Sequence, residues 1–358
     1  MASTSATTEF PLDEARRIVR DLMAPRPLVY WLDFLFHITL GWAAFVATLL
    51  APQFSVWQAV GYLVTALAFY RAVIFIHELA HLKRGTFGAF RLVWNILCGV
   101  PLLVPSFTYH GVHNDHHKRD VYGTDEDGEY LPFVTRGRLA IVLYVLEFVV
   151  LPFLFVARFV ILTPVSYLHP ALRRLVWAHA SSLTIDLAYS RPPPDRRSGN
   201  GWRWQEFFAF VWGAAFIGLV VAGIVTWKAL VLWYLVGLMI FLLNSLRTLA
   251  AHCYRNPGGR RMSVAEQYLD SVDVPGLPFV TALWAPVGLR FHATHHLFPA
   301  MPYHSLGEAR RRLMRELPDN RLYAETLRGG LWDALARLWR EAGRGPAGQA
   351  GQAGDVAS

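Results

Sequence analysis

Long apolar runs alternate with short polar turns along the chain. Residues 29–51 and 54–76 are two apolar runs joined at Pro52, and residues 207–227 and 229–251 are two more, joined by a single residue. Each run is long enough to cross the hydrocarbon layer as a helix. Because each connection is so short, the helices of a pair must turn back on each other. The pattern predicts an all-α integral membrane fold with four spanning helices in two hairpins.

Three further apolar stretches are shorter or interrupted. Residues 92–107 contain two prolines, residues 141–163 contain a glutamate, a proline and an arginine, and residues 275–290 are too short to cross comfortably. Such segments lie in the interface or re-enter more often than they span. We expect all three to be helices on the cytoplasmic face, because one extra crossing would separate the histidine clusters described below.

Charge sets the orientation of the predicted spans. The chain is 54% hydrophobic and 17% charged, has a mean hydropathy of +0.30 and carries a net charge of +8, as in polytopic membrane proteins. Basic residues gather at one end of the spans: Arg16, Arg17, Arg20, Arg26, Lys83, Arg84, Arg203, Arg255, Arg260 and Arg261. By the positive-inside rule this end is cytoplasmic, in a bacterial inner membrane or the endoplasmic reticulum. The rule also accounts for the positive charge, so we expect no nucleic acid partner.

The chain divides into four segments by composition. Residues 1–28 are polar, lack the features of a cleavable secretory signal and are expected to be cytoplasmic. Residues 29–317 form the membrane domain with a helical cytoplasmic cap, and residues 318–342 an amphipathic helix. Residues 343–358 are rich in Gly, Ala and Gln and are expected to be disordered. Cys98 and Cys253 are too few for a disulfide framework.

Eight of the fourteen histidines fall into three clusters, each where an apolar run gives way to polar sequence. The clusters read HxxxH, HxxHH and HxxHH, and consist of His77, His81, His113, His116, His117, His292, His295 and His296. On a helix, residues three or four positions apart share a face. Since imidazole is the commonest protein ligand for transition metals, the clusters predict a site for more than one metal ion on the cytoplasmic side.

Two other histidines extend this set. His252 ends the fourth apolar run at the same membrane side and is either a ninth ligand or a boundary residue. His110 precedes His113 by three residues, and ligation, a supporting contact and contact with substrate all remain open for it. Ligating imidazoles usually donate their second N–H to an oxygen acceptor. Acidic residues near the clusters are Asp115, Asp120, Asp125, Asp127, Glu266, Asp270 and Asp273.

Two charged residues fall inside the predicted spans. Asp33 lies in the first span and Arg71 in the second, at nearly the same depth if the hairpin is right. Charges inside a membrane are rare and usually paired. We therefore expect Asp33 and Arg71 to form an ion pair with a structural role.

The three clusters together resemble the membrane fatty acid desaturase family, the histidine-box di-iron enzymes. The matching boxes are HELAH at 77–81, HNDHH at 113–117 and HATHH at 292–296. His252 matches the family's additional histidine, FHATHHLFPAMPYHSL is similar to the context of its third box, and the likeness covers residues 29–317. The resemblance implies two iron ions, dioxygen as co-substrate and an external electron donor. It implies first a desaturase of a fatty acyl chain and, as the alternative, a membrane lipid hydroxylase.

The third box departs from one subgroup of the family. Some relatives have Gln at its first position and carry a fused haem domain, whereas this chain has His292. The departure favours a separate ferredoxin or cytochrome b-type donor, which the basic cap could dock. The substrate implied by the resemblance is a fatty acyl lipid, an acyl-CoA or an acyl-ACP.

A second class of enzyme also fits one of the boxes. HELAH matches the zinc-protease pattern HExxH, in which Glu78 would be the general base. Such a protease needs one metal and three ligands, so it has no use for two HxxHH clusters. A metal transporter is disfavoured as well, because its ligands should line the spans rather than cap them.

Overall fold

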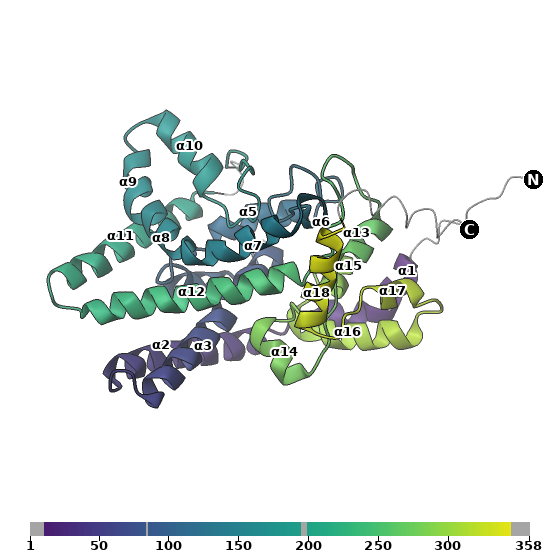
Figure 1. The fold of residues 1–358 in the computed structure, drawn as a ribbon, viewed down its shortest axis with the longest axis horizontal. Coiled ribbons are helices and arrows are strands. Elements are labelled where there is room, and N and C mark those ends of the chain that lie inside the picture. Colours follow the sequence, from purple (N-terminus) through teal and green to yellow (C-terminus); the bar gives the residue numbers. More distant parts are fainter. Residues whose placement is uncertain (1–10, 84, 195–198, 345–358) are drawn as a thin grey trace, which may run out of the picture.

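The computed structural model describes residues 11–83, 85–194 and 199–344, whose regular elements are all helices (Figure 1). Four of them are long and apolar enough to cross a membrane: α2 (Pro27–Leu50), α3 (Val56–His81), α11 (Gly201–Val221) and α12 (Trp227–Leu249). α2 packs along α3, and α11 contacts α12 near their short connection. The prediction of an all-α membrane fold with four spans in two hairpins is confirmed.

Local chemistry explains where the hairpins turn. The Ser55 side chain caps α3 by accepting a hydrogen bond from the Gln58 amide, and Thr226 caps α12 by accepting one from the Lys228 amide. Within the first hairpin, a Cβ at Gly41 would overlap the Phe69 ring, so glycine allows the two helices to approach closely.

Shorter helices complete the chain. Those between the two hairpins are α4 (Gly88–Trp94), η2 (Asn95–Gly99), α5 (Phe107–His116), α6 (Phe133–Arg136), α7 (Arg138–Leu146), η3 (Glu147–Val149), α8 (Leu151–Val156), η4 (Ala157–Leu162), α9 (Thr163–Ser166) and α10 (Pro170–Ala180). The remaining ones are α1 (Leu12–Val19), η1 (Arg20–Met23), α13 (Val264–Asp270), α14 (Pro278–Trp284), α15 (His292–Leu297), α16 (Tyr303–Glu316), α17 (Arg321–Glu325) and α18 (Leu331–Ala342).

The first interrupted apolar stretch lies among the spanning helices. Trp42 of α2 donates its indole N–H to the Leu97 carbonyl at 3.0 Å. Trp212 of α11 and Trp233 of α12 donate theirs to the Pro101 carbonyl at 3.2 and 3.3 Å. Irregular backbone is tolerated at membrane depth when protein groups satisfy it. These contacts correct the prediction of a helix on the cytoplasmic face, because Trp233 lies about 24 Å along α12 from its carboxyl end.

The second interrupted stretch also lies against the spanning helices. The helices Arg138–Val149 and Leu151–Ser166 meet at a bend of 57° and together are apolar enough for a fifth crossing. At the bend, Tyr234 of α12 donates its hydroxyl to the Val149 carbonyl at 3.0 Å. Beyond it, Arg158 pairs with Glu206 in the second turn of α11. These contacts correct the prediction of a helix on the cytoplasmic face, because the bent pair packs along α11 and α12.

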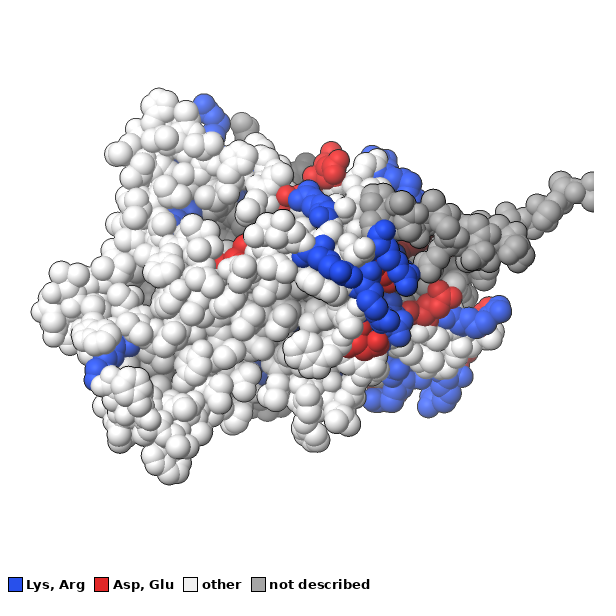
Figure 2. Space-filling view, in the orientation of Figure 1, with Lys and Arg blue, Asp and Glu red and all other residues white. Residues whose placement is uncertain are grey.

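Charged residues gather at one end of the molecule, over α16 and α18 in Figure 2, whereas the face around the spanning helices is nearly free of charge. We call α1, η1, α13 and α15–α18 the charged end. Its core is apolar, with Ala15 and Val19 of α1 packed against Leu306 and Leu313 of α16. The expected disordered tail, 343–358, lies outside the described residues apart from its first two positions.

The third apolar stretch contains α14, which projects beside the carboxyl half of α12 (Figure 1). Its side chains Phe279, Val280 and Leu283 are exposed. An apolar helix surface of this kind suits contact with lipid at the interface, as expected for residues 275–290.

Candidate metal centre

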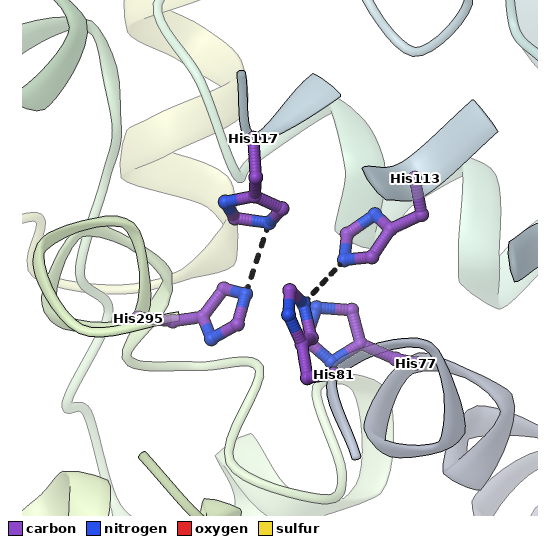
Figure 3. A group of neighbouring side chains, drawn as sticks. All are labelled: His77, His81, His113, His117 and His295. Carbon is purple, nitrogen blue, oxygen red and sulfur yellow. Dashed lines mark hydrogen bonds between the residues drawn. The ribbon is translucent and has the colours of Figure 1, made fainter. Parts of the chain in front are cut away.

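Five histidines from three helices converge on one point (Figure 3). They are His77, His81, His113, His117 and His295, and one ring nitrogen of each lies within 4.8 Å of the others. The Nε2 atoms of His81 and His113 are 2.7 Å apart, and those of His117 and His295 are 3.1 Å apart. We call these residues the five-histidine group.

Four more histidines form a neighbouring group with the same spacing limit: His116, His252, His292 and His296. The Nε2 atom of His292 lies 2.9 Å from that of His252 and 3.1 Å from that of His296. The rings of His117 and His296 stack with centroids 4.4 Å apart, so the two groups are adjacent. We call these residues the four-histidine group. All nine histidines proposed as ligands thus come together, whereas His110 is in neither group.

Helical spacing divides each HxxHH box between the two groups. In α5, His113 and His117 are four residues apart and face the five-histidine group, while His116 is turned toward the other. In α15, the pair four residues apart, His292 and His296, faces the four-histidine group, and His295 is turned away from it. The box pattern alone does not predict this division, because residues three and four positions apart both count as one helix face.

Buried oxygen atoms hold the outer nitrogens of three rings. Nδ1 of His113 lies 2.9 Å from a Glu129 oxygen, and Nδ1 of His116 lies 2.8 Å from an Asp127 oxygen. Nδ1 of His252 lies 2.9 Å from the hydroxyl of Tyr122. Such contacts select the tautomer that leaves Nε2 available as a ligand.

Only part of this supporting set is predicted from the sequence. Asp127 is among the predicted acids, and so is Asp270, whose carboxylate accepts a hydrogen bond from the Tyr122 hydroxyl at 3.1 Å. Asp273 is another, and its carboxylate accepts hydrogen bonds from the amide and hydroxyl of Thr294 and so orients α15. Glu129 is not among them, although it follows Asp127 by two positions, and the sequence carries no signal for Tyr122.

The other four named acids lie away from the histidines. Asp115 pairs with Lys118, and Glu266 pairs with Arg260 and closes a capping box with Ser263. Asp120 and Asp125 are exposed.

Several ring nitrogens in the two groups have no hydrogen-bond partner among the described residues. Both nitrogens of His77 are buried without one, as are Nδ1 of His292 and Nδ1 of His295. Buried polar atoms are rarely left unsatisfied in proteins. His77, which is 3% exposed, is therefore a better ligand for a metal than a core residue. The residues present fit transition-metal ions, since neutral imidazoles and nearby carboxylates suit iron, zinc or copper.

Burial keeps the imidazoles in the neutral form that a metal requires. It lowers the pKa values of six rings well below their usual range, helped by neighbouring histidines: His113, His117, His252, His292, His295 and His296. Burial also acts on His116, but the adjacent Asp127 carboxylate outweighs it and the pKa of His116 is raised.

The Glu78 carboxylate is occupied by structural hydrogen bonds and is not free to act as a general base. Its Oε2 atom accepts a hydrogen bond from the Tyr30 hydroxyl at 2.5 Å and another from the Tyr303 amide at 3.2 Å. These bonds tie α3 to α2 and α16. A metalloprotease needs this carboxylate beside a metal-bound water. Nine clustered histidines also exceed what one zinc ion uses, so the site argues against the protease alternative.

A cavity of about 150 Å³ opens beside the histidines. His77, His252 and His292 border it, so it touches both histidine groups. It also reaches Leu151 in α8 and Phe241 in α12, within the bundle. The cavity thus connects the candidate metal centre with the apolar interior, where a lipid chain could lie.

Comparisons with known proteins agree with this architecture. A family model described as fatty acid desaturase matches residues 55–327, which include every histidine of both groups. The chain is also similar to a ceramide hydroxylase of Caulobacter vibrioides, with 38% identity over 331 residues that cover 91% of this chain and 92% of that protein. The chain therefore belongs to the fatty acid desaturase family, in the wider histidine-box group of membrane desaturases and hydroxylases.

Proposed function

We propose that this chain is a membrane lipid hydroxylase that uses two iron ions and dioxygen. The histidine boxes alone favour desaturation, with hydroxylation as the alternative. Hydroxylation takes precedence because a relative that matches nearly the whole chain is named for hydroxylation of a ceramide. That similarity is the observation that carries the proposal. Hydroxylation and desaturation are both oxidations of a lipid by an enzyme of this family.

The two histidine groups would each hold one iron ion. The five-histidine group would bind one and the four-histidine group the other, through the ring nitrogens that lie within 4.8 Å of one another. Bound there, iron would supply the reduction of dioxygen and the oxidation of an unactivated C–H bond. In the balanced reaction, one oxygen atom enters the lipid as a hydroxyl group. The other leaves as water, with two electrons and two protons taken up from outside.

The protein's own groups would position the reactants. Glu129 and Asp127 orient His113 and His116, so the ligand nitrogens face the metals before they bind. The cavity beside His77 would hold the lipid chain and exclude water from it. An alkyl chain offers no polar handle, so selection of one carbon depends on this fixed placement.

Electrons would come from a separate ferredoxin or cytochrome b-type protein. The basic residues of the charged end would attract an acidic donor, and the positive-inside rule predicts that this end faces the cytoplasm.

The proposal is tested by expressing the chain in a bacterial host that is fed a ceramide, under dioxygen labelled with heavy oxygen. We expect a lipid product that has gained one labelled oxygen atom, measured by mass spectrometry. The His117→Ala variant, matched in expression, is the control and should form no product. A product that has lost two hydrogen atoms and gained no oxygen would instead establish the desaturase reading.

A further inference from the structure

The cavity beside the histidines contains polar atoms that no metal would use. Nε of Arg247, Oε1 of Glu129 and Oγ of Ser182 are all buried and have no hydrogen-bond partner among the described residues. All three residues line the same cavity. Buried unsatisfied groups are uncommon, and three around one space indicate that a ligand completes them.

Arg247 carries a buried charge that forms no direct ion pair among the described residues, although the more distant Glu129 carboxylate attracts it. It lies in the last turn of α12, is 9% exposed, donates a hydrogen bond to the Asn244 side chain at 2.9 Å and also contacts the Tyr70 hydroxyl. No carboxylate of the described residues lies within ion-pair distance of it. Two other arginines in helices differ, since the partly buried Arg71 pairs with Asp33 and the buried Arg158 pairs with Glu206.

An unpaired charge inside a membrane bundle is costly to retain. Its usual explanation is a functional partner that arrives from outside the protein. The partner must supply a hydrogen-bond acceptor, because the guanidinium is a donor only. The Glu129 carboxylate is an acceptor and needs a hydrogen-bond donor from the partner, while the Ser182 hydroxyl can either donate or accept.

We propose that Arg247, Glu129 and Ser182 bind the polar group of the lipid substrate, and that this group combines a carbonyl oxygen with an N–H or hydroxyl donor. An amide-linked lipid with hydroxyl groups meets both demands. An ester or thioester of a fatty acid offers the carbonyl but no donor, so Glu129 would stay unsatisfied. This inference rests on the proposed lipid hydroxylase function and specifies its substrate class.

The arrangement also determines where the chain is oxidised. Arg247 precedes His252 by five residues, and both border the cavity with His77 and His292. A polar group held at Arg247 therefore lies beside the metal centre, while the apolar chain extends toward Leu151 and Phe241. The hydroxyl group is added at a carbon close to the polar group, not far along the chain.

The binding site is tested with purified full-length protein in detergent, without electron donor, so that no turnover occurs. The probes are radiolabelled N-octanoyl sphinganine, which carries both donors and acceptors, and methyl stearate, which carries acceptors only. We expect the unmodified protein to bind the amide probe at least about 10-fold more tightly. Equal affinity for the two probes would overturn the inference, even if every variant folded poorly.

Variants then identify the residue responsible. Arg247→Met should weaken binding of the amide probe by about 10- to 100-fold, and Arg247→Lys should restore part of the loss. Lys228→Met removes the same charge from an exposed position at the other end of α12 and should bind as the unmodified protein does. Iron content should be the same in all of them. Unchanged binding by an iron-replete Arg247→Met protein would overturn the assignment.

The product distinguishes this inference from the function on which it rests. Hydroxylation next to the polar group supports both. Hydroxylation far along the chain overturns the inference and leaves the hydroxylase proposal standing. A double bond without added oxygen overturns the proposed function, while the binding comparison still decides whether Arg247 recognises a polar group.

Discussion

Arg71 and Asp33 form a two-pronged ion pair inside the first hairpin. Nε of Arg71 lies 2.7 Å from one carboxylate oxygen of Asp33, and its NH2 lies 2.6 Å from the other. Tyr303 of α16 donates its hydroxyl to the same carboxylate at 2.8 Å. The predicted pairing is confirmed, and the contact with Tyr303 shows that the pair also fastens the charged end to the spans.

Breaking this pair from one side should cost more than removing it whole. Asp33→Asn or Arg71→Met leaves a partly buried charge without its partner, and we expect either to lower the free energy of unfolding by about 2–4 kcal/mol. The double variant should lose less stability than either single variant, because no charge is left without its partner. Thermal unfolding in detergent measures all three. Strictly additive losses would show that the two charges do not depend on each other.

The division of the boxes predicts separate metal losses. His81→Ala disrupts only the five-histidine group and His292→Ala only the four-histidine group, so each should lower the iron content from about two ions per chain to about one. Elemental analysis of purified protein gives the ratio. His110→Ala is the matched control, because His110 is in neither group, and it should keep about two ions. Loss of both ions from the His110→Ala protein would show that His110 takes part in the metal centre.

The carboxylate behind His116 should tune metal binding. Asp127→Asn keeps the shape of the side chain but weakens the contact with Nδ1 of His116, so metal affinity should fall by about 10- to 100-fold in the four-histidine group. Titration with a competing chelator measures the change. Asp125→Asn, two residues away and exposed, should release iron as the unmodified protein does. Equal chelator resistance in the two variants would deny Asp127 this role.

Glu78 should matter for stability and not for chemistry. Glu78→Gln retains an acceptor for the hydrogen bonds from Tyr30 and Tyr303, so we expect normal product formation and a loss of stability of about 1 kcal/mol. Product yield per iron-loaded chain is the deciding measurement. An inactive Glu78→Gln protein with full iron content would show that Glu78 takes part in catalysis.

The histidines should make the metal-free protein sensitive to acid. Six of them have pKa values lowered in the folded state by burial and by neighbouring histidines. Below a pH of about 6.5 the unfolded chain binds protons at these histidines that the folded chain does not. The contribution of the neutral histidines to the free energy of unfolding is therefore complete above this pH and is lost as the pH falls. Each ring lowers the free energy of unfolding by up to about 1.4 kcal/mol for each pH unit below that point. Melting temperatures of metal-free protein across this range test the expectation, which a flat profile would refute.

The interrupted apolar stretches show where sequence reasoning failed. Prolines and charges in residues 92–107 and 141–163 correctly argued against simple crossings. The sequence could not show that indole N–H groups of Trp212 and Trp233 satisfy the Pro101 carbonyl, or that Glu206 receives Arg158. Contacts with partners distant in sequence hold both stretches against the spanning helices, whereas each segment alone favours the interface.

Periodicity and spacing alone determined the four spans, their hairpin pairing and the eight box histidines that meet at one end, because these depend on local hydrophobicity and on the helical repeat. Only the tertiary structure decided how the boxes divide between two groups, that Glu129 and Tyr122 support the rings, and that Arg247 faces the cavity unpaired. The physical reason is that each of these depends on the rotation of one helix against another. Such rotation is set by packing between residues far apart in the chain.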